Sequence, residues 1–187
     1  MMTPINSYNV IDSLKNFSVE EIQKYYIENS INAAIAMTHT EQDFNLSNVI
    51  RTANFLGFRE VFYVGGPRKY DRRGCVGVQN YIPITHCKTK DEFFDIIKDR
   101  YIPIALENNL PLNCVGEPIN LFDFTWPKNP VIIVGEEQSG IPSDILIRCK
   151  SFIEIYAHGT VRSMNVGTAA GIAMSVYRNA YDKRLTI

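Results

Sequence analysis

The segment Val131-Ile-Ile-Val-Gly-Glu-Glu-Gln-Ser-Gly-Ile-Pro142 sets the architecture that we predict for this chain. Its four apolar residues stopped by a glycine are typical of a buried strand that runs into a loop. A shorter strand is predicted at residues 152–157, and a helix of small residues follows Ser163 and Asn165, which are good helix caps. In an open α/β sheet, ligands bind where such strands end. We therefore expect the functional site in this last third of the chain.

Composition limits the classes of protein to which the chain can belong. A length of 187 residues with 45% hydrophobic residues suits one α/β domain. The net charge of −1 gives no overall basic field for nucleic acid, although a local patch is allowed. The four cysteines form no CxxC pair, so free thiols and no metal site are expected. No segment suits a membrane span or a signal peptide, which predicts a soluble cytoplasmic protein.

Alternating strand and helix patterns predict the fold class. An N-terminal arm and helix are expected at 1–30 and the main domain at 31–187, within a single domain overall. Two capping boxes begin helices, one at 18–21 and one at 89–92. The other expected elements are strands at 31–37, 60–64, 82–85 and 101–106, and a helix that Asn45 caps and Gly57 stops. This order predicts a mainly parallel sheet with helices on both faces.

The loop from Gly135 to Gly140 excludes several chemistries. The chain has no GxxxxGK[ST] phosphate loop, and Glu137 stands where a dinucleotide fingerprint needs its middle glycine. A carboxylate there repels phosphate, so the loop suits either a ligand without phosphate or a purely structural turn. A nucleotide-dependent dehydrogenase is excluded on the same ground. No GxSxG elbow surrounds Ser163, and the three histidines form no relay, so a serine hydrolase is poorly supported.

Three segments together are similar to the motifs of the SpoU family of RNA ribose 2′-O-methyltransferases, in the SPOUT superfamily. They are Asn45-Leu-Ser-Asn-Val-Ile-Arg51-Thr-Ala-Asn-Phe-Leu-Gly57, Gly135-Glu-Glu-Gln-Ser-Gly140 and Ser163-Met-Asn165-Val-Gly-Thr-Ala-Ala170. Their order and separations over residues 32–180 match the family. The chain departs from the family pattern at Tyr156, Met164 and Gly167, where proline, leucine and serine are usual.

The resemblance implies a C-terminal deep trefoil knot, a topology that general chain-threading rules do not predict. It also implies bound S-adenosylmethionine and no metal. Gly135, Ile155 and Met164 are expected to line that cofactor, with Ala105, Leu106 and Glu107 on its adenine side. Glu137 and Asn165 are expected to hold the loops and border the substrate, and Ser163 to form hydrogen bonds within the knot. Plain helix capping is the alternative role for Ser163 and Asn165.

Arg51 is the residue that the resemblance assigns to catalysis. A ribose hydroxyl attacks well only when its proton is removed or its developing charge is stabilised. An arginine has a pKa above about 12 and is a poor base, so electrostatic activation is the preferred role. A phosphate contact or a solvated helix charge is the alternative. Asn45 is expected to orient Arg51, with N-capping as its alternative.

RNA binding and a homodimer complete the expectations. Arg68, Lys69, Arg72 and Arg73, with Tyr70 among them, form a basic segment suited to RNA, or else a solvated loop. The resemblance implies a homodimer in which Arg51 reaches towards the partner's cofactor. The small residues 169–175 suit such packing or burial within one chain. The expected substrate is tRNA, with rRNA or a catalytically inactive RNA-binding scaffold as the alternatives.

Overall fold

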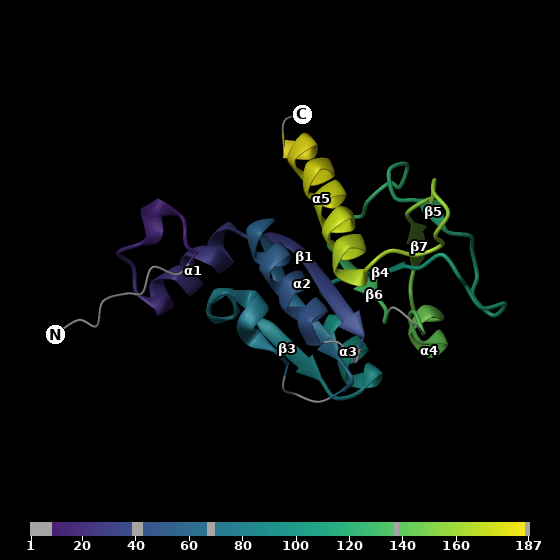
Figure 1. The fold of residues 1–187 in the computed structure, drawn as a ribbon, viewed down its shortest axis with the longest axis horizontal. Helices are drawn as coiled ribbons and strands as arrows, with labels where there is room; N and C mark the ends of the chain where they lie inside the picture. The colour runs from purple at the N-terminus through teal and green to yellow at the C-terminus, as the bar shows by residue number, and fades with distance from the viewer. Residues whose placement is uncertain (1–8, 39–42, 67–69, 137–138, 186–187) are drawn as a thin grey trace.

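The fold is built on one parallel β-sheet (Figure 1). The computed structural model describes residues 9–38, 43–66, 70–136 and 139–185. Within them the strand order is β3-β2-β1-β6-β4-β7-β5, and every pairing is parallel, which confirms the predicted sheet. The strands are β1 (Ile31–Thr38), β2 (Phe58–Val64), β3 (Ile84–Cys87), β4 (Ile102–Leu106), β5 (Ile119–Asn120), β6 (Pro130–Val134) and β7 (Ser151–Glu154).

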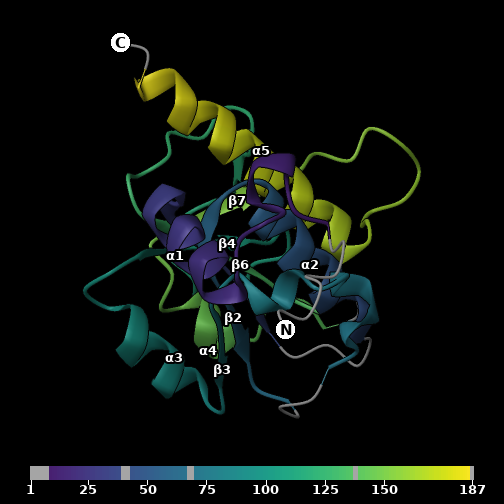
Figure 2. The same cartoon turned by 90° about the vertical axis from the view of Figure 1, so that its left-hand side faces the viewer.

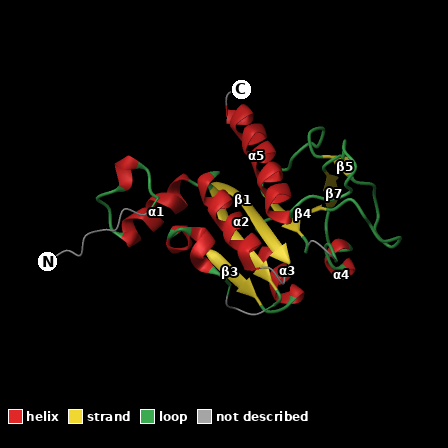
Figure 3. Ribbon diagram, viewed as in Figure 1, coloured by secondary structure: helices red, strands yellow, loops and turns green. Residues whose placement is uncertain are grey.

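Helices cover both faces of the sheet, as predicted (Figures 2 and 3). Side chains alternate along a strand, so β1 sends Ile35 and Met37 to one face and Ala34 and Ala36 to the other. The first face packs on α2 and α5, and the second packs on α3 and α4. The helices are α1 (Val19–Asn29), α2 (Asp43–Phe55), α3 (Lys90–Ile97), α4 (Ser143–Leu146) and α5 (Val166–Leu185), with short 3₁₀ turns η1 (Asp12–Leu14), η2 (Arg72–Cys75) and η3 (Val78–Asn80).

Local signals placed several helix ends correctly. The amide N–H of Glu21 donates to Ser18 Oγ (3.2 Å), and the Ser18 N–H donates to Glu21 Oε2 (2.7 Å), which completes the predicted capping box of α1. Thr89 caps α3 by accepting from the Glu92 N–H at 3.1 Å. Gly57 has φ +72°, which confirms glycine as the stop of α2. Capping chemistry therefore fixed these boundaries from sequence alone.

Other boundaries were predicted wrongly. Helix α2 begins at Asp43, so Asn45 lies inside its first turn and is not its N-cap. Strand β3 lies at 84–87 instead of 82–85, because it pairs in register with residues 61–64 of β2. The two-residue strand β5 lies between β4 and β6, where no strand was predicted. Within the described ranges no helix has the length and apolar character that a membrane crossing needs.

Candidate functional site

A cavity of about 1280 Å³ lies at the carboxyl ends of β4, β6 and β7. These strands are neighbours in the order β6-β4-β7, so the loops after Leu106, Val134 and Glu154 meet at one edge of the sheet. Among the predicted cofactor residues, Leu106, Glu107, Gly135, Ile155 and Met164 line the cavity, and Ser163 lines it as well. The structure therefore brings together three segments that are far apart in sequence. Ala105 lies elsewhere, fully buried in the core on the α3 and α4 side of the sheet.

Two glycines shape the loop after β6. A Cβ on Gly135 would lie 2.2 Å from the carbonyl carbon of Gly140, closer than real Cβ atoms approach. Gly140 has φ +66°, and a Cβ on it would lie 2.5 Å from Glu107 Oε2. Two backbone hydrogen bonds close this turn. The Glu136 N–H donates to the Gly140 carbonyl oxygen at 3.2 Å, and the Gly140 N–H donates to the Glu136 carbonyl oxygen at 2.9 Å. The loop therefore needs glycine at 135, where its own backbone folds back, and at 140, where φ is positive and the Glu107 carboxylate lies close.

The Glu107 carboxylate joins the loop after β4 to the loop after β6. Its Oε2 accepts from the Ile141 N–H at 3.1 Å, and its Oε1 accepts from the N–H groups of Asn108 and Asn109 at 3.0 and 3.2 Å. Hydrogen bonds to a charged acceptor are the stronger kind. Asn108 Nδ2 in turn donates to the Arg162 carbonyl oxygen at 3.3 Å. Glu107 thus holds the shape of the cavity through backbone groups, a role that sequence reasoning missed.

Carboxylates predominate in the cavity lining. Glu107, Glu136 and Glu154 line it, against one arginine, Arg162. Ser139 Oγ donates to Glu136 Oε2 at 2.6 Å and fixes that side chain. Within the described part of the chain no group of three or more His, Cys, Asp or Glu side chains could hold a metal ion. This lining disfavours phosphate and suits a ligand with positive charge.

The starts of α2 and α5 are tied together beside the cavity. Asn165 Nδ2 donates to Asn45 Oδ1 at 2.9 Å, although the two residues are 120 positions apart. Asn165 Oδ1 also accepts from the Thr168 N–H at 3.2 Å, so Asn165 is the N-cap of α5 as well. Capping, the alternative role for Asn165, is therefore present, and its second bond joins it to the first turn of α2. Ser163 is exposed and is not the cap of this helix.

Close packing of α5 on α2 uses the small residues. Ala170 and Ala173 are fully buried, and the absent side chain of Gly171 faces Thr52 Cγ2 at 3.7 Å. A Cβ on Gly167 would lie 3.2 Å from Asn165 Oδ1, a contact tight enough that the Asn165 side chain would have to shift slightly. Much of the small-residue segment therefore packs within one chain.

Arg51 projects from α2 and is exposed. It does not line the cavity of its own chain. No ion pair between described residues involves Arg51. Its guanidinium is therefore available to a ligand or to another chain.

The basic segment is anchored on α2. Ser47 Oγ donates to the Asp71 carbonyl oxygen, and a Cβ on Gly74 would lie 2.7 Å from Ser47 Cβ. Hydrogen bonds from Arg73 lower the pKa of Asp71 to about 2. Arg72 lies close to Tyr70, with its guanidinium carbon 5.9 Å from the ring centre. Of the predicted residues, Arg68, Lys69 and Glu137 lie outside the residues that the structure describes.

Arg59 lies apart from the basic segment. It stands at the amino end of β2. Burial raises the pKa values of Tyr26 and Tyr101, and the nearby charge of Arg59 partly offsets both shifts. It is therefore beside these two tyrosines, at the end of the strand opposite to Gly65.

The sequence of this chain is similar to that of a known protein family and to known proteins. The profile of the SpoU rRNA Methylase family matches residues 32–175. A tRNA (guanosine(18)-2′-O)-methyltransferase of Escherichia coli is 26% identical over 142 residues, which cover 75% of this chain and 60% of that protein. The Saccharomyces cerevisiae protein of the same name is 36% identical over 55 residues, 29% of this chain and 4% of that protein. This chain thus spans less than two thirds of the length of either relative.

Solved structures agree on the fold. The A. aeolicus TrmH/SpoU tRNA modifying enzyme superposes with a TM-score of 0.75 at 18% identity, over 89% of this chain and 83% of that one. The SpoU methyltransferase AviRb of Streptomyces viridochromogenes, in complex with AdoMet, gives 0.72 at 18% identity, over 84% and 64%. The parallel sheet described above is thus the fold of SpoU methyltransferases. Because the family profile covers more than half of its length, this chain belongs to the SpoU family.

Proposed function

We propose that this chain transfers the methyl group of S-adenosylmethionine to a ribose 2′-hydroxyl of RNA, with tRNA preferred over rRNA as substrate. Family membership supports methyl transfer, and the bacterial and yeast relatives are both named as tRNA 2′-O-methyltransferases. The observation on which the proposal depends is the cavity at the ends of β4, β6 and β7, which suits a cationic ligand without phosphate. The threading of the chain into a knot is part of the proposal, by analogy with the family.

The residues of the cavity fit this cofactor. S-adenosylmethionine has a sulfonium, an ammonium and a carboxylate group, so its net charge is positive, and it has no phosphate. When bound it supplies an electrophilic methyl group. The excess of carboxylates in the lining attracts positive charge and repels phosphate. Leu106, Gly135, Ile155 and Met164 would hold the cofactor through backbone and apolar contacts. Glu107 acts on the loops that surround it, because its oxygens already accept three backbone N–H groups.

Arg51 activates the ribose hydroxyl electrostatically. As the hydroxyl loses its proton, negative charge develops on its oxygen, and a fixed cation beside that oxygen lowers the barrier. A guanidinium keeps its proton at neutral pH, so it stabilises this charge instead of accepting the proton. Its exposure on α2 and the lack of an ion-pair partner among the described residues support this role. Asn45 and Asn165 position the helix from which Arg51 projects.

A homodimer would bring Arg51 of one chain close to the cofactor bound by the other chain. Arg51 lies outside the lining of its own chain's cavity, so a second chain is needed if it is to act on a substrate bound there. Phe55, on the same helix, is 87% exposed and offers apolar surface for such a contact.

Equilibrium sedimentation tests the dimer. Mixing Arg51→Ala with Gly135→Ala protein tests the shared site, because recovery of activity in the mixture requires one intact site formed by two chains.

Methyl transfer to RNA is the experiment that tests the proposed function. The protein is incubated with tritiated S-adenosylmethionine and with purified tRNA or rRNA, and the labelled RNA is digested with alkali. A label in tRNA within alkali-resistant dinucleotides is expected, because a 2′-O-methyl group blocks cleavage of the next phosphodiester. A label in alkali-sensitive nucleotides would show base methylation and contradict the ribose assignment. Cofactor binding without any transfer to either RNA would favour the inactive RNA-binding scaffold.

A further inference from the structure

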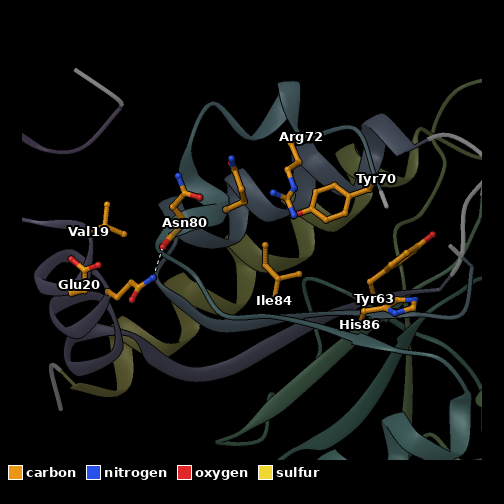
Figure 4. A pocket seen from close by; sticks show the side chains of 10 residues that line it. Val19, Glu20, Tyr63, Tyr70, Arg72, Asn80, Ile84 and His86 are labelled. Carbon is orange, nitrogen blue, oxygen red and sulfur yellow. Dashed lines mark hydrogen bonds between the residues drawn. The ribbon is translucent and has the colours of Figure 1, made fainter. Parts of the chain in front are cut away.

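A second cavity, of about 670 Å³, lies at the β3 edge of the sheet, on the face that α2 covers (Figure 4). It shares no lining residue with the cavity at the ends of β4, β6 and β7. We name it the β3 groove and define it by Tyr63, Tyr70, Arg72, Gln79, Ile84 and His86, with Glu20 of α1 at its far end. Its volume lies within the range of small-molecule sites, about 300–1000 Å³.

Aromatic rings form much of the groove wall. The ring centres of Tyr63 and His86 are 5.4 Å apart, because the two residues are register partners on β2 and β3. His86 Nε2–H donates to the carbonyl oxygens of Gly65 and Gly66 at 3.2 and 3.3 Å, which fixes the plane of the imidazole. Tyr63 is nearly fully buried, so its ring offers little surface to a ligand. The partly exposed rings of His86 and Tyr70 are therefore the surfaces available for stacking.

Gln79 places an unpaired hydrogen-bond acceptor in this wall. Its Oε1 atom is buried and has no hydrogen-bond partner among the residues that the structure describes. Buried acceptors are nearly always paired, so an unpaired acceptor on a residue that lines a groove points to a ligand with an N–H donor. The aromatic rings alone would suit any flat apolar molecule. The acceptor on Gln79 restricts the candidate ligands to flat ring systems that also donate a hydrogen bond.

Charge is separated along the groove. Figure 4 shows Arg72 and Tyr70 near one end and Glu20 at the other, with Ile84 between them. Glu20 is the one carboxylate among the lining residues. The ion pairs between described residues include Arg73 with Asp71 but none with Arg72. An anionic group is therefore favoured at the Arg72 end and disfavoured at the α1 end.

We propose that the β3 groove binds a nucleotide, with its base against His86 and Tyr70, a base N–H on Gln79 Oε1 and its phosphate beside Arg72. Stacking on aromatic rings combined with a nearby cation is how proteins hold single-stranded RNA. The source that we favour is an unpaired nucleotide of the RNA substrate, so the choice of source rests on the proposed function. A free mononucleotide has the same chemistry and is the other source. The groove then holds RNA at a distance from the methyl-transfer site.

Equilibrium binding tests the groove with two kinds of probe. Fluorescein-labelled single-stranded hexanucleotides of A, C, G and U are titrated by anisotropy, and AMP, CMP, GMP and UMP are titrated by calorimetry. Arg72→Gln is compared with Arg73→Gln, which makes the same charge change one residue away but removes a cation already paired with Asp71. Arg72→Gln is expected to weaken binding about ten- to a hundredfold, in line with one charged hydrogen bond, and Arg73→Gln less than about twofold.

Gln79→Met separates binding from folding. The substitution keeps the length of the side chain and removes an acceptor that has no partner among the described residues. Binding is expected to fall about threefold to tenfold, the effect of one hydrogen bond, while the melting temperature stays the same or rises. A merely structural role for Gln79 would instead lower the melting temperature and leave binding unchanged.

The outcomes separate this inference from the proposed function. Tighter binding of hexanucleotides than of mononucleotides supports RNA as the source, and equal binding supports a free nucleotide. If neither probe binds, or if Arg72→Gln and Gln79→Met bind like Arg73→Gln, the inference is overturned even when methyl transfer is intact. If methyl transfer is absent but nucleotide binding depends on Arg72 and Gln79, the inference about the groove is supported and the proposed function is contradicted.

Discussion

The cavity at the ends of β4, β6 and β7 and the surface of α2 with its neighbouring β3 groove differ in how they are built. Backbone turns, glycines and a carboxylate bonded to main-chain N–H groups shape the cavity. Side chains with available polar or aromatic groups form the second region, among them Arg51, Arg72 and His86. Substitutions in the cavity should therefore change its shape and stability. Substitutions on the second region should remove one charge or contact and leave the fold intact.

Arg51→Ala gives the largest expected effect and separates the two regions most clearly. Loss of a group that stabilises the developing charge should lower kcat for methyl transfer by about 10²–10³-fold. The affinity for S-adenosylmethionine and the melting temperature should stay as in the wild type, because Arg51 is exposed and does not line the cavity. Single-turnover transfer and cofactor calorimetry on the same preparation measure both. Arg51→Lys is the matched control for charge, and wild-type rates in Arg51→Ala would remove this residue from the mechanism.

Gly135→Ala should damage the cavity itself. The new Cβ would overlap the backbone of Gly140 at 2.2 Å, so the loop must shift. Overpacking of this kind destabilises by about 1–3 kcal/mol, and we expect cofactor affinity to fall at least about tenfold. Gly159→Ala is the control, because Gly159 also lines the cavity but has nothing within 4 Å of its Cβ position. Equal unfolding midpoints for the two variants would contradict the claim that the loop from Gly135 to Gly140 has no room for a Cβ at position 135.

Glu107→Gln should have a smaller effect in the same region. The carboxylate accepts three backbone hydrogen bonds, and an amide replaces one of its oxygens with a donor that faces an N–H group. The loss is expected to be about 1.5–3 kcal/mol, measured by urea unfolding, with weaker cofactor binding. Glu117→Gln, an exposed change of the same charge, is the control. Weaker cofactor binding with unchanged stability would instead indicate a direct contact between Glu107 and the ligand.

Substitution of Asn165 should cause the smallest loss of stability, and it tests the hydrogen bond that joins α5, beside the cavity, to α2. Asn165→Ala removes the cap of α5 and the bond to Asn45, with a loss of about 1 kcal/mol. Asn165→Asp keeps the capping acceptor and removes the donor to Asn45. If Asp restores stability but not the rate of methyl transfer, the bond between α2 and α5 positions Arg51. If Asp restores both, capping alone explains the residue.

Local signals in the sequence predicted much of the fold. The apolar run at 131–134, the serine and threonine caps of α1 and α3 and the glycine at the end of α2 each depend on neighbouring residues, so they appear in the sequence directly. Asn45 was assigned to the wrong position because helix α2 begins two residues earlier, at Asp43. Its actual partner, Asn165, is 120 residues away, which no local pattern reveals.

Long-range contacts explain what the sequence did not reveal about the sites. The bond from the Ile141 N–H to Glu107 spans 34 residues, and the signal available beforehand was only a carboxylate at the end of a strand. The β3 groove combines α1, β2, β3 and the segment at 70–80. Its Tyr63 and His86 pair depends on strand β3, whose bounds were predicted two residues off. The family resemblance, in contrast, identified six of the residues that line the cavity, because it places the loops after β4, β6 and β7 in one pocket.

Calorimetric titration of the wild-type protein with S-adenosylmethionine and, separately, with ATP tests the central claim most directly. Both ligands contain adenosine, but one has a cationic sulfonium and the other a chain of phosphates. An acidic cavity closed around Gly135 and Gly140 should bind S-adenosylmethionine, lose that binding in Gly135→Ala, and give no heat with ATP. Absence of S-adenosylmethionine binding, or comparable binding of ATP at the same site, would contradict the account.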